Sequence, residues 1–405
     1  MEQLKIGIIK EGKTPPDTRV LLNPAQCAEI IKQYPGIEIK VQQSANRCFS
    51  DAEYTARGIT LVDDVSDCDL LLGVKEVPID NLIADKTYFF FSHTFKAQPY
   101  NRGLLQAILQ KNIQLVDYEV LTNEQGIRLI AFGRFAGIVG AHNGLMAYGN
   151  RTGAFQLGRV GSFKDQAALY NSYKTIKLPP VKIVLTGNGR VAKGAVETLE
   201  AMGIKQVGIE DYLSQTFEYP VYVQLDSDKL YHRKDGGAFE FSHFFQQPSE
   251  YACNFSRFYK ATDIMINAIY WDPKAPAYFT LEEMQQTDFK ITSIADITCD
   301  IAPESSLPST LRASTIADPV YGFNPNTNTE CEAYTDGMID VMAVDNLPNE
   351  LPRDASQAFG EQFSQYILPE LFNLQNSPII KRASIAVNGQ LGKNFTYLKS
   401  YVEGV

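Results

Sequence analysis

Ionisable side chains lie within two residues after three predicted strands in the first third of the chain. They are Lys75 and Glu76 after residues 70–74, His93 after 88–91, and Glu119 after 113–118. Because the carboxyl ends of neighbouring parallel strands meet along one edge of a sheet, we expect these side chains to converge in one crevice. A histidine with an ordinary pKa of about 6.5 exchanges protons near neutral pH, and a lysine beside a second cation titrates closer to that range. The pattern therefore predicts a proton-transfer site.

Each of these residues also has a structural interpretation. A single histidine after an aromatic strand is often structural, and a Lys–Glu pair at a strand end is often a solvated ion pair. Their grouping at consecutive strand ends keeps the catalytic interpretation of His93 and Lys75 open beside the structural one. Arg19, which follows the loop after the first strand, and Lys96 are expected to face the same edge.

A glycine-rich turn joins a predicted strand over 181–186 to a predicted helix. Its residues are Gly187, Asn188, Gly189, Arg190, Val191 and Ala192, which gives the spacing G-x-G-x-x-A. The first glycine permits the tight turn, the second lets a pyrophosphate approach the backbone, and the small third residue lets the helix pack on its strand. The turn predicts a dinucleotide site formed by Gly187, Gly189, Arg190 and Val191. A glycine-rich loop without a ligand is the alternative.

A second predicted strand, residues 206–210, ends at Glu210 and Asp211. An acid about 20 residues after the first glycine of such a turn binds the adenosine ribose hydroxyls and repels a 2′-phosphate. The two acids therefore predict NAD as the cofactor.

Composition excludes several classes of protein. The 405 residues include 47 acidic and 37 basic side chains, a net charge of −10, which argues against nucleic acid as the main partner. No run approaches the roughly 18 apolar residues of a membrane span, and the N-terminus lacks the pattern of a signal peptide. Six scattered cysteines show no metal-ligand spacing, so we expect no metal and a reducing, cytoplasmic location.

Strand and helix patterns alternate along the chain, which is typical of an α/β protein with parallel sheets. We expect two Rossmann-like domains with the active-site cleft between them. Residues 1–135 form the first, with a helix from Pro24 that is N-capped by Asn23, and 136–325 form the second, with an insertion at 212–262. Residues 326–405 are expected to complete the first domain through a returning C-terminal helix.

The chain resembles saccharopine dehydrogenases of the L-lysine-forming type, within the wider alanine dehydrogenase/transhydrogenase-like superfamily. The resemblance covers nearly the whole length of the chain. In the first domain its motifs are KEG near the start, Arg19 before NP, GVKE at 73–76, FSHTFKAQ at 91–98 and DYEVLTNEQGIRLIAFGRFAG at 117–137. Further along the chain they are CDI at 299–301 and VDNLP-x-x-LPRDAS at 344–356. The glycine turn instead looks like that of the lysine–oxoglutarate reductase half of bifunctional enzymes, which tends to use NADP.

The resemblance implies roles for several residues. Lys75 and His93 match an acid–base pair, and Glu76 and Glu119 match the acids that tune it. Positive residues matching Arg19 and Lys96 hold substrate carboxylates, and Arg134, in the shared segment 117–137, is assigned to substrate binding with them. Asp300 matches an aspartate near the nicotinamide.

The implied reaction is the NAD(P)-dependent conversion of saccharopine and water to L-lysine and 2-oxoglutarate, or its reverse. We expect a small-molecule enzyme that is a monomer or homodimer. The alternatives are an alanine dehydrogenase-like amino-acid dehydrogenase and a non-catalytic NAD-binding homologue.

Overall fold

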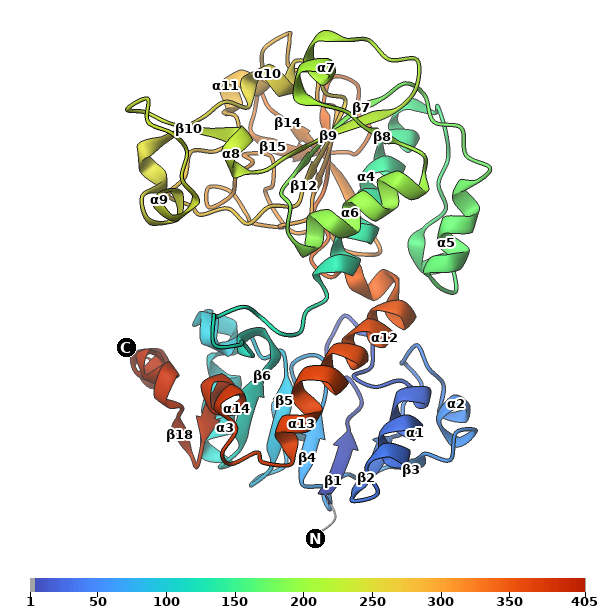
Figure 1. Ribbon diagram of the computed structural model, residues 1–405, viewed down its shortest axis with the longest axis vertical. Helices are drawn as coiled ribbons and strands as arrows, with labels where there is room; N and C mark the ends of the chain where they lie inside the picture. The colour runs from blue at the N-terminus through green and yellow to red at the C-terminus, as the bar shows by residue number, and fades with distance from the viewer. Residues whose placement is uncertain (1–3, 405) are drawn as a thin grey trace. The chain divides into compact units, whose positions relative to one another are not determined.

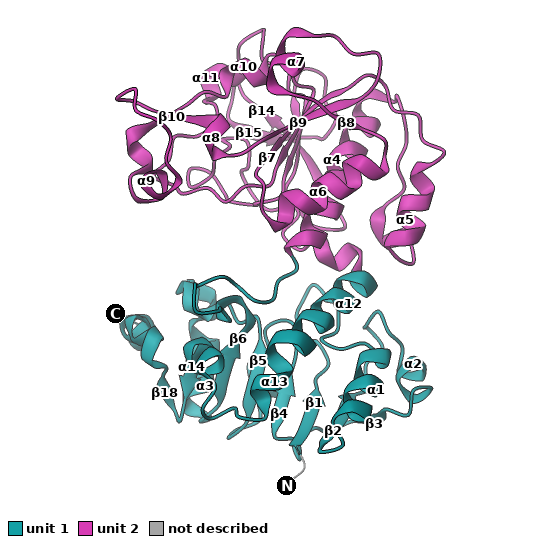
Figure 2. Ribbon diagram, in the orientation of Figure 1, with its two compact units in different colours: residues 1–132, 352–405 teal, residues 133–351 magenta. Residues whose placement is uncertain are grey.

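The computed structural model, which describes residues 4–404, divides into two compact units (Figures 1 and 2). Unit 1 comprises residues 1–132 and 352–405, and unit 2 comprises 133–351. The second unit therefore runs to Leu351 rather than to residue 325. The expected boundary falls short because residues 320–342 form three further strands of the second sheet.

Unit 1 is built on an eight-stranded sheet in the order β18-β17-β6-β5-β4-β1-β2-β3. Its parallel strands are β1 (Leu4–Ile8), β2 (Ile37–Gln42), β3 (Thr60–Val62), β4 (Leu70–Leu72), β5 (Thr87–Phe90) and β6 (Gln114–Asp117). The antiparallel strands β17 (Ser384–Val387) and β18 (Gln390–Leu391) extend it. Strand order reverses between β1 and β4, and such a switch point leaves a crevice at the carboxyl ends of the strands.

Helices cover both faces of this sheet. One hydrophobic cluster contains residues of α1 (Pro24–Gln33), α2 (Asp51–Thr55), α12 (Pro352–Gln362), α13 (Leu368–Leu371) and α14 (Pro378–Ala383). A second cluster, on the opposite face, contains residues of α3 (Arg102–Gln110) and α15 (Lys399–Glu403). The capping box of Asn23 and Gln26 begins α1 at Pro24, as predicted. The C-terminal helices return to unit 1, as expected.

Unit 2 contains a second eight-stranded sheet, in the order β15-β14-β16-β13-β12-β7-β9-β8. The parallel strands are β7 (Lys182–Thr186), β8 (Lys205–Gln206), β9 (Val221–Leu225), β12 (Ile264–Asn267), β13 (Ser293–Asp296) and β16 (Ile339–Met342). The antiparallel strands β14 (Val320–Asn324) and β15 (Thr329–Cys331) complete one edge. Strands β9 and β12 flank β7, the strand that leads into the glycine-rich turn.

The predicted strand over 206–210 is wrong beyond its first residue. Gly208 instead begins helix α7 (Ile209–Ser214), and the short β8 lies at the sheet edge. Strand β9, which the sequence assigned to an insertion, lies between β8 and β7. The rest of that segment is a small lobe of α8 (Ser227–Leu230), the β10–β11 hairpin (Tyr231–Arg233 and Tyr251–Cys253), α9 (Phe241–Gln246) and α10 (Ser256–Tyr259).

Two helices pack unusually closely in unit 2. A Cβ atom on Gly137 of α4 (Gly133–Thr152) would lie 1.8 Å from the Val191 carbonyl oxygen on α6 (Arg190–Ala201). A Cβ on Gly194 would lie 1.9 Å from the carbonyl oxygen of Arg134. Glycine is thus required on both faces of this contact. Two shorter helices, α5 (Gln166–Tyr173) and α11 (Leu281–Met284), complete the unit.

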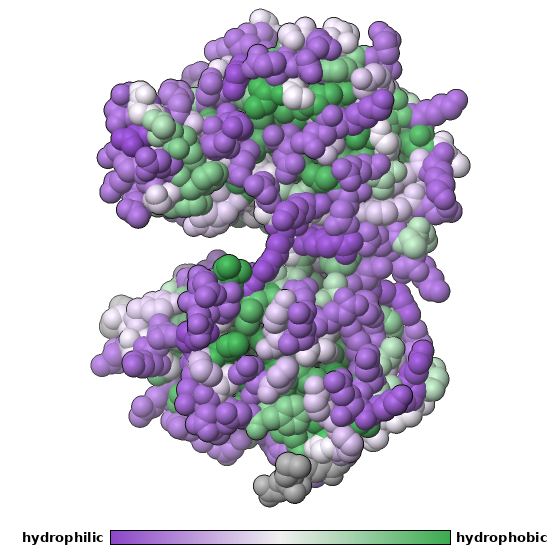
Figure 3. Space-filling view, in the orientation of Figure 1, coloured by the Kyte–Doolittle hydropathy of each residue, from purple (hydrophilic) through white to green (hydrophobic). Residues whose placement is uncertain are grey.

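The visible face of each unit is mostly hydrophilic, with small hydrophobic patches (Figure 3). Among residues 4–404, no helix is both long and apolar enough to cross a membrane.

Candidate active site

The imidazole of His93 lies between two carboxylates at the carboxyl edge of the unit 1 sheet. Its Nδ1 donates to Glu76 Oε1 over 2.6 Å, and its Nε2 lies 4.0 Å from Glu119 Oε2. Burial favours a neutral Glu76, but the contact with His93 and the charge of Lys13 outweigh it and lower the Glu76 pKa to about 2. A carboxylate at Nδ1 fixes the imidazole tautomer and leaves Nε2 for proton exchange. The structure therefore brings His93, Glu76 and Glu119 together.

A strained turn carries His93 out of strand β5. Its φ is 56°, in the left-handed region that side chains other than glycine seldom adopt. Asp117, at the end of β6, accepts hydrogen bonds from Ser92 N at 2.7 Å, Ser92 Oγ at 2.6 Å and His93 N at 3.2 Å. Burial raises the pKa of Asp117, which is fully enclosed. Asp117 is thus a positioning residue that the sequence reasoning missed.

Lys75 lies at the end of β4 with its amine largely shielded from water. Burial, together with the positive charges of Arg19 and Lys13, lowers its pKa to about 8. An amine with this pKa both donates and accepts protons under ordinary conditions. Lys13, which the sequence reasoning did not single out, also approaches Glu76 Oε2 to 3.3 Å.

Glu11 holds the backbone beneath Lys75. Its Oε1 accepts from Val74 N over 2.7 Å, and its Oε2 accepts from Lys75 N over 2.8 Å. Burial raises the pKa of Glu11 to about 8 despite these two hydrogen bonds. The carboxyl group bridges the loop after β1 to the end of β4, and so fixes where the Lys75 side chain begins.

Two of the predicted carboxylate-binding cations join this region in different ways. Lys96 Nζ lies 3.1 Å from Glu119 Oε1, and Arg128 Nη1 lies 3.9 Å from the same oxygen. Arg19 is only 2% exposed. It donates from Nε and Nη2 to Asp17 over 2.9 and 2.5 Å and lies over the Phe132 ring.

Arg134, the third residue predicted to bind substrate, forms its ion pair within unit 2. It belongs to unit 2, on α4, and donates from Nε and Nη2 to Glu197 on α6 over 2.7 and 2.6 Å. The unit 1 cluster described above does not include it.

In unit 2, the glycine-rich turn has the shape that a pyrophosphate needs. Gly187 has a φ of 93°, and a Cβ there would lie 2.8 Å from the Ala268 carbonyl oxygen. Gly189 is the N-cap of α6, and no atom lies within 4 Å of the position of a Cβ at this residue. The amides of the first turn of α6, which contains Arg190 and Val191, can therefore be approached by an anion.

The acid beside this turn is Asp226 rather than Glu210 or Asp211. Asp226 directly follows β9, the neighbour of β7, and its Oδ2 accepts from Asn188 Nδ2 over 3.0 Å. Glu210 and Asp211, the predicted ribose-binding acids, lie exposed in the first turn of α7, after the edge strand β8, so neither directly follows a strand that neighbours β7. The signal in the sequence was the run VYVQL at 221–225, rich in β-branched and aromatic residues and followed directly by Asp226.

A hydrophobic hollow lies between the segments that follow β9 and β12. Its lining includes Ser227, directly after Asp226, with Phe244, Ile269 and Tyr270. Tyr270 is 78% exposed, so a flat ring system can stack on it from solvent. The glycine turn and Asp226 fit the phosphates and the ribose of a dinucleotide.

A buried hydrogen-bond chain supports the loop that carries Asp300. Thr186 Oγ1 donates to Asn267 Oδ1 over 2.7 Å, and Asn267 Nδ2 donates to Asp296 Oδ1 over 3.0 Å. Thr298 Oγ1 donates to the same Asp296 oxygen over 2.7 Å and accepts from the Asp300 amide over 3.4 Å. The ends of β7, β12 and β13 are thus tied to the Asp300 loop.

Comparisons with known proteins agree with this architecture. Residues 7–139 match the family model of the alanine dehydrogenase/PNT N-terminal domain. The chain is 29% identical to a saccharopine dehydrogenase [NAD(+), L-lysine-forming] of Neurospora crassa, over 90% of this chain and 91% of that protein. The chain is a homologue of the saccharopine dehydrogenases.

Two further matches extend the comparison. An alpha-aminoadipic semialdehyde synthase of Arabidopsis thaliana is 31% identical over 97% of this chain but only 41% of its own length. The chain thus spans less than half of the synthases that it matches. The structure of an L-alanine dehydrogenase superposes with a TM-score of 0.65 at 15% identity, covering 98% of this chain and all of that one. In this homologue of the saccharopine dehydrogenases, the predicted resemblance and α/β fold are confirmed.

Proposed function

We propose that this homologue is an NAD(P)-dependent oxidoreductase acting on the CH–NH bond of saccharopine. The observation that carries the proposal is the His93 imidazole held between Glu76 and Glu119, together with Lys75, which follows the neighbouring strand β4 and has a pKa of about 8. Hydrolysis of a secondary amine through an imine needs several proton transfers near neutral pH, and this cluster has two groups suited to them. The relatives named saccharopine dehydrogenase support the choice of substrate.

The cofactor fits unit 2. Gly187, Gly189 and the first turn of α6 would hold the pyrophosphate, and Asp226 would accept hydrogen bonds from the ribose hydroxyls. When bound, the cofactor would supply the acceptor for the hydride that leaves the substrate carbon. Because a carboxylate at this place repels a 2′-phosphate, we propose NAD as the preferred cofactor.

The chain's own residues then move protons. Lys75 accepts a proton from the secondary amine, and His93 Nε2 deprotonates the water that adds to the imine carbon. As the C–N bond of the carbinolamine breaks, the same two groups return their protons to the leaving nitrogen and the hydroxyl proton passes to water, which gives L-lysine and 2-oxoglutarate. Glu76 stabilises the imidazolium that forms, because its carboxylate stays ionised. Lys96 and Arg19 are proposed to bind substrate carboxylates.

Absorbance of NADH tests the proposal in both directions: saccharopine with NAD⁺, and L-lysine with 2-oxoglutarate and NADH. Turnover should fall in His93→Gln and persist in His232→Gln, a matched control at an exposed position on β10. Turnover with pyruvate and ammonia alone would instead indicate an alanine dehydrogenase. NADH binding without turnover on any amine would indicate a non-catalytic homologue.

We also propose a cytoplasmic location and a small-molecule enzyme that works as a monomer or homodimer. All six cysteines are free, which suits a reducing compartment. Fractionation of cells and light scattering of the purified chain test these two points.

A further inference from the structure

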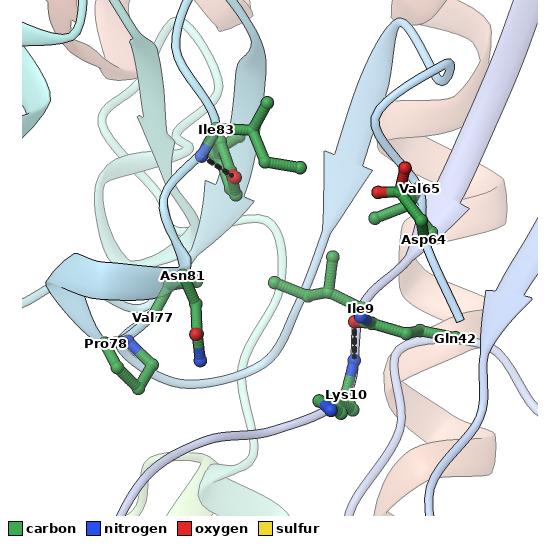
Figure 4. Close-up of a pocket in the computed structure, with 10 residues that line it drawn as sticks. Ile9, Lys10, Gln42, Asp64, Val65, Val77, Pro78, Asn81 and Ile83 are labelled. Atoms are coloured by element: carbon green, nitrogen blue, oxygen red, sulfur yellow. Dashed lines mark hydrogen bonds between the residues drawn. The ribbon is translucent and has the colours of Figure 1, made fainter. Parts of the chain in front are cut away.

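A separate cavity of about 250 Å³ opens on unit 1 (Figure 4). It lies where β1, β2 and β3 end, and none of Lys75, Glu76, His93 or Glu119 lines it. Its floor includes Val65, Val77 and Tyr88, which belong to the hydrophobic cluster on the α3 face of the sheet. Phe91, next to the candidate active site, belongs to the cluster on the opposite face. The cavity is therefore distinct from the proton-transfer site.

The floor of the cavity presents an apolar surface, because the Tyr88 hydroxyl is already engaged in a hydrogen bond within the protein. The hydroxyl of Tyr88 accepts a hydrogen bond from Ile83 N over 2.9 Å, so the Tyr88 ring contributes an apolar surface. Ile9, Val65 and Val77 extend that surface. An aliphatic chain that binds here leaves water without breaking any protein hydrogen bond.

The rim of the cavity has opposite charges. Gln42 Oε1 accepts from the Lys10 amide over 3.1 Å and anchors that residue, while the Lys10 ammonium makes no ion pair with any other described residue. Asp64 caps Ser66 N over 2.9 Å, and each of its carboxylate oxygens keeps a lone pair for another donor. Asn81 adds an amide at the mouth.

We propose that this cavity binds one apolar α-amino acid. Lys10 and Asn81 recognise its carboxylate, Asp64 recognises its ammonium group, and the floor takes its aliphatic side chain. A volume of about 250 Å³ is below the roughly 300–1,000 Å³ of sites for larger ligands, which favours a single amino acid over a nucleotide.

The cavity lies directly behind the loops of the candidate active site. Lys10 precedes Glu11, whose carboxyl group holds the amides of Val74 and Lys75. A Cβ on Gly12 would lie 2.7 Å from Pro78 Cγ, so the segments around residues 9–12 and 75–81 are in close contact. A ligand touching Ile9, Lys10, Val77 and Pro78 bridges both segments and thereby affects the backbone of Lys75.

Isothermal titration with L-norleucine tests the proposal. Saturable binding is expected, and pentanoate and pentylamine, which each lack one charged group, should bind at least about tenfold more weakly. Lys10→Met and Asp64→Asn should weaken norleucine at least about tenfold, and Asn81→Trp should block the mouth. Lys164→Met, an exposed change in unit 2, is the matched control.

Two results would overturn the proposal: absence of saturable binding, or an affinity unchanged by Lys10→Met and Asp64→Asn. Loss of norleucine binding in His93→Gln, with Lys10→Met unaffected, would place the amino acid at the proton-transfer site instead. Because binding is measured without turnover, the outcome is independent of whether the chain oxidises saccharopine.

Discussion

Replacing Glu11 by Gln should remove a pH dependence from the stability of unit 1. In the folded chain, burial raises the pKa of Glu11 to about 8, well above the ordinary value of 4.5. The fold therefore binds a proton that the unfolded chain releases between these two values. The raised pKa of Glu11 stabilises the folded chain relative to the unfolded chain, in full below about pH 4.5. This stabilisation is lost as the pH rises through about 8.

The magnitude follows from one proton. Each pH unit inside this window costs the wild type about 1.4 kcal/mol, so about 2.7 kcal/mol is lost between about pH 5.5 and 7.5. Glutamine keeps the shape but has no proton to release. The difference in unfolding free energy, wild type minus Glu11→Gln, should thus fall by about 2.7 kcal/mol over this range. The lowered pKa of Lys75 acts only above about pH 8 and in the opposite direction.

Urea unfolding of both proteins at three pH values measures this difference. Glu29→Gln, an exposed change on α1 in the same unit, is the matched control and should parallel the wild type. A difference between wild type and Glu11→Gln that stays constant within about 0.5 kcal/mol would refute the account of Glu11 as a buried, proton-binding acid.

Three further predictions concern the two halves of the proposed mechanism. Asp226→Ser should reduce the ratio of catalytic efficiencies with NADH and NADPH at least about tenfold, whereas Glu210→Gln should leave that ratio unchanged; steady-state kinetics with both cofactors decides. His93→Gln and Lys75→Met should each lower kcat about 10²- to 10⁴-fold, and the double variant should be little worse than the poorer single one; near-normal kcat with a reduced Tm would indicate a structural role. Gly189→Val should abolish NADH binding in calorimetry while circular dichroism stays unchanged, because its side chain fills the place of a phosphate.

Local patterns predicted the fold better than they predicted its strand order. The sequence identified the end of β5 and the candidate functional residues after it. This was possible because the aromatic residues of the strand and the polar residues that follow it are consecutive in the chain. Glu11 and Asp117 were missed because each acts on a backbone segment far away, 63 or 64 residues for Glu11 and 24 or 25 for Asp117. Such contacts depend on which strands are neighbours in the sheet. The spacing of residues within one segment does not determine that order of strands.

The cofactor acid shows the same limit. Glu210 has the usual spacing in sequence from Gly187. However, the strand before it, β8, has only two residues and lies at the edge of the sheet. Asp226 lies further along the chain, after a strand that was taken for part of an insertion. Counting residues after the glycines did not find Asp226, because the place of such an acid is set by the strand that neighbours β7 in the sheet.

The division of unit 1 into residues 1–132 and 352–405 has a consequence for synthesis. Strand β17 pairs with β6, and Gln114 Nε2 donates to Ser384 Oγ across 270 residues of chain. A ribosome releases all of unit 2 before β17 emerges, so unit 2 has every residue it needs to fold first, while the β6 edge of unit 1 waits unpaired. An open strand edge is a template for pairing with other chains. Nascent chains halted near residue 351 should therefore depend on chaperones, and a circular permutant that starts at Pro352 would make unit 1 continuous and relieve that dependence.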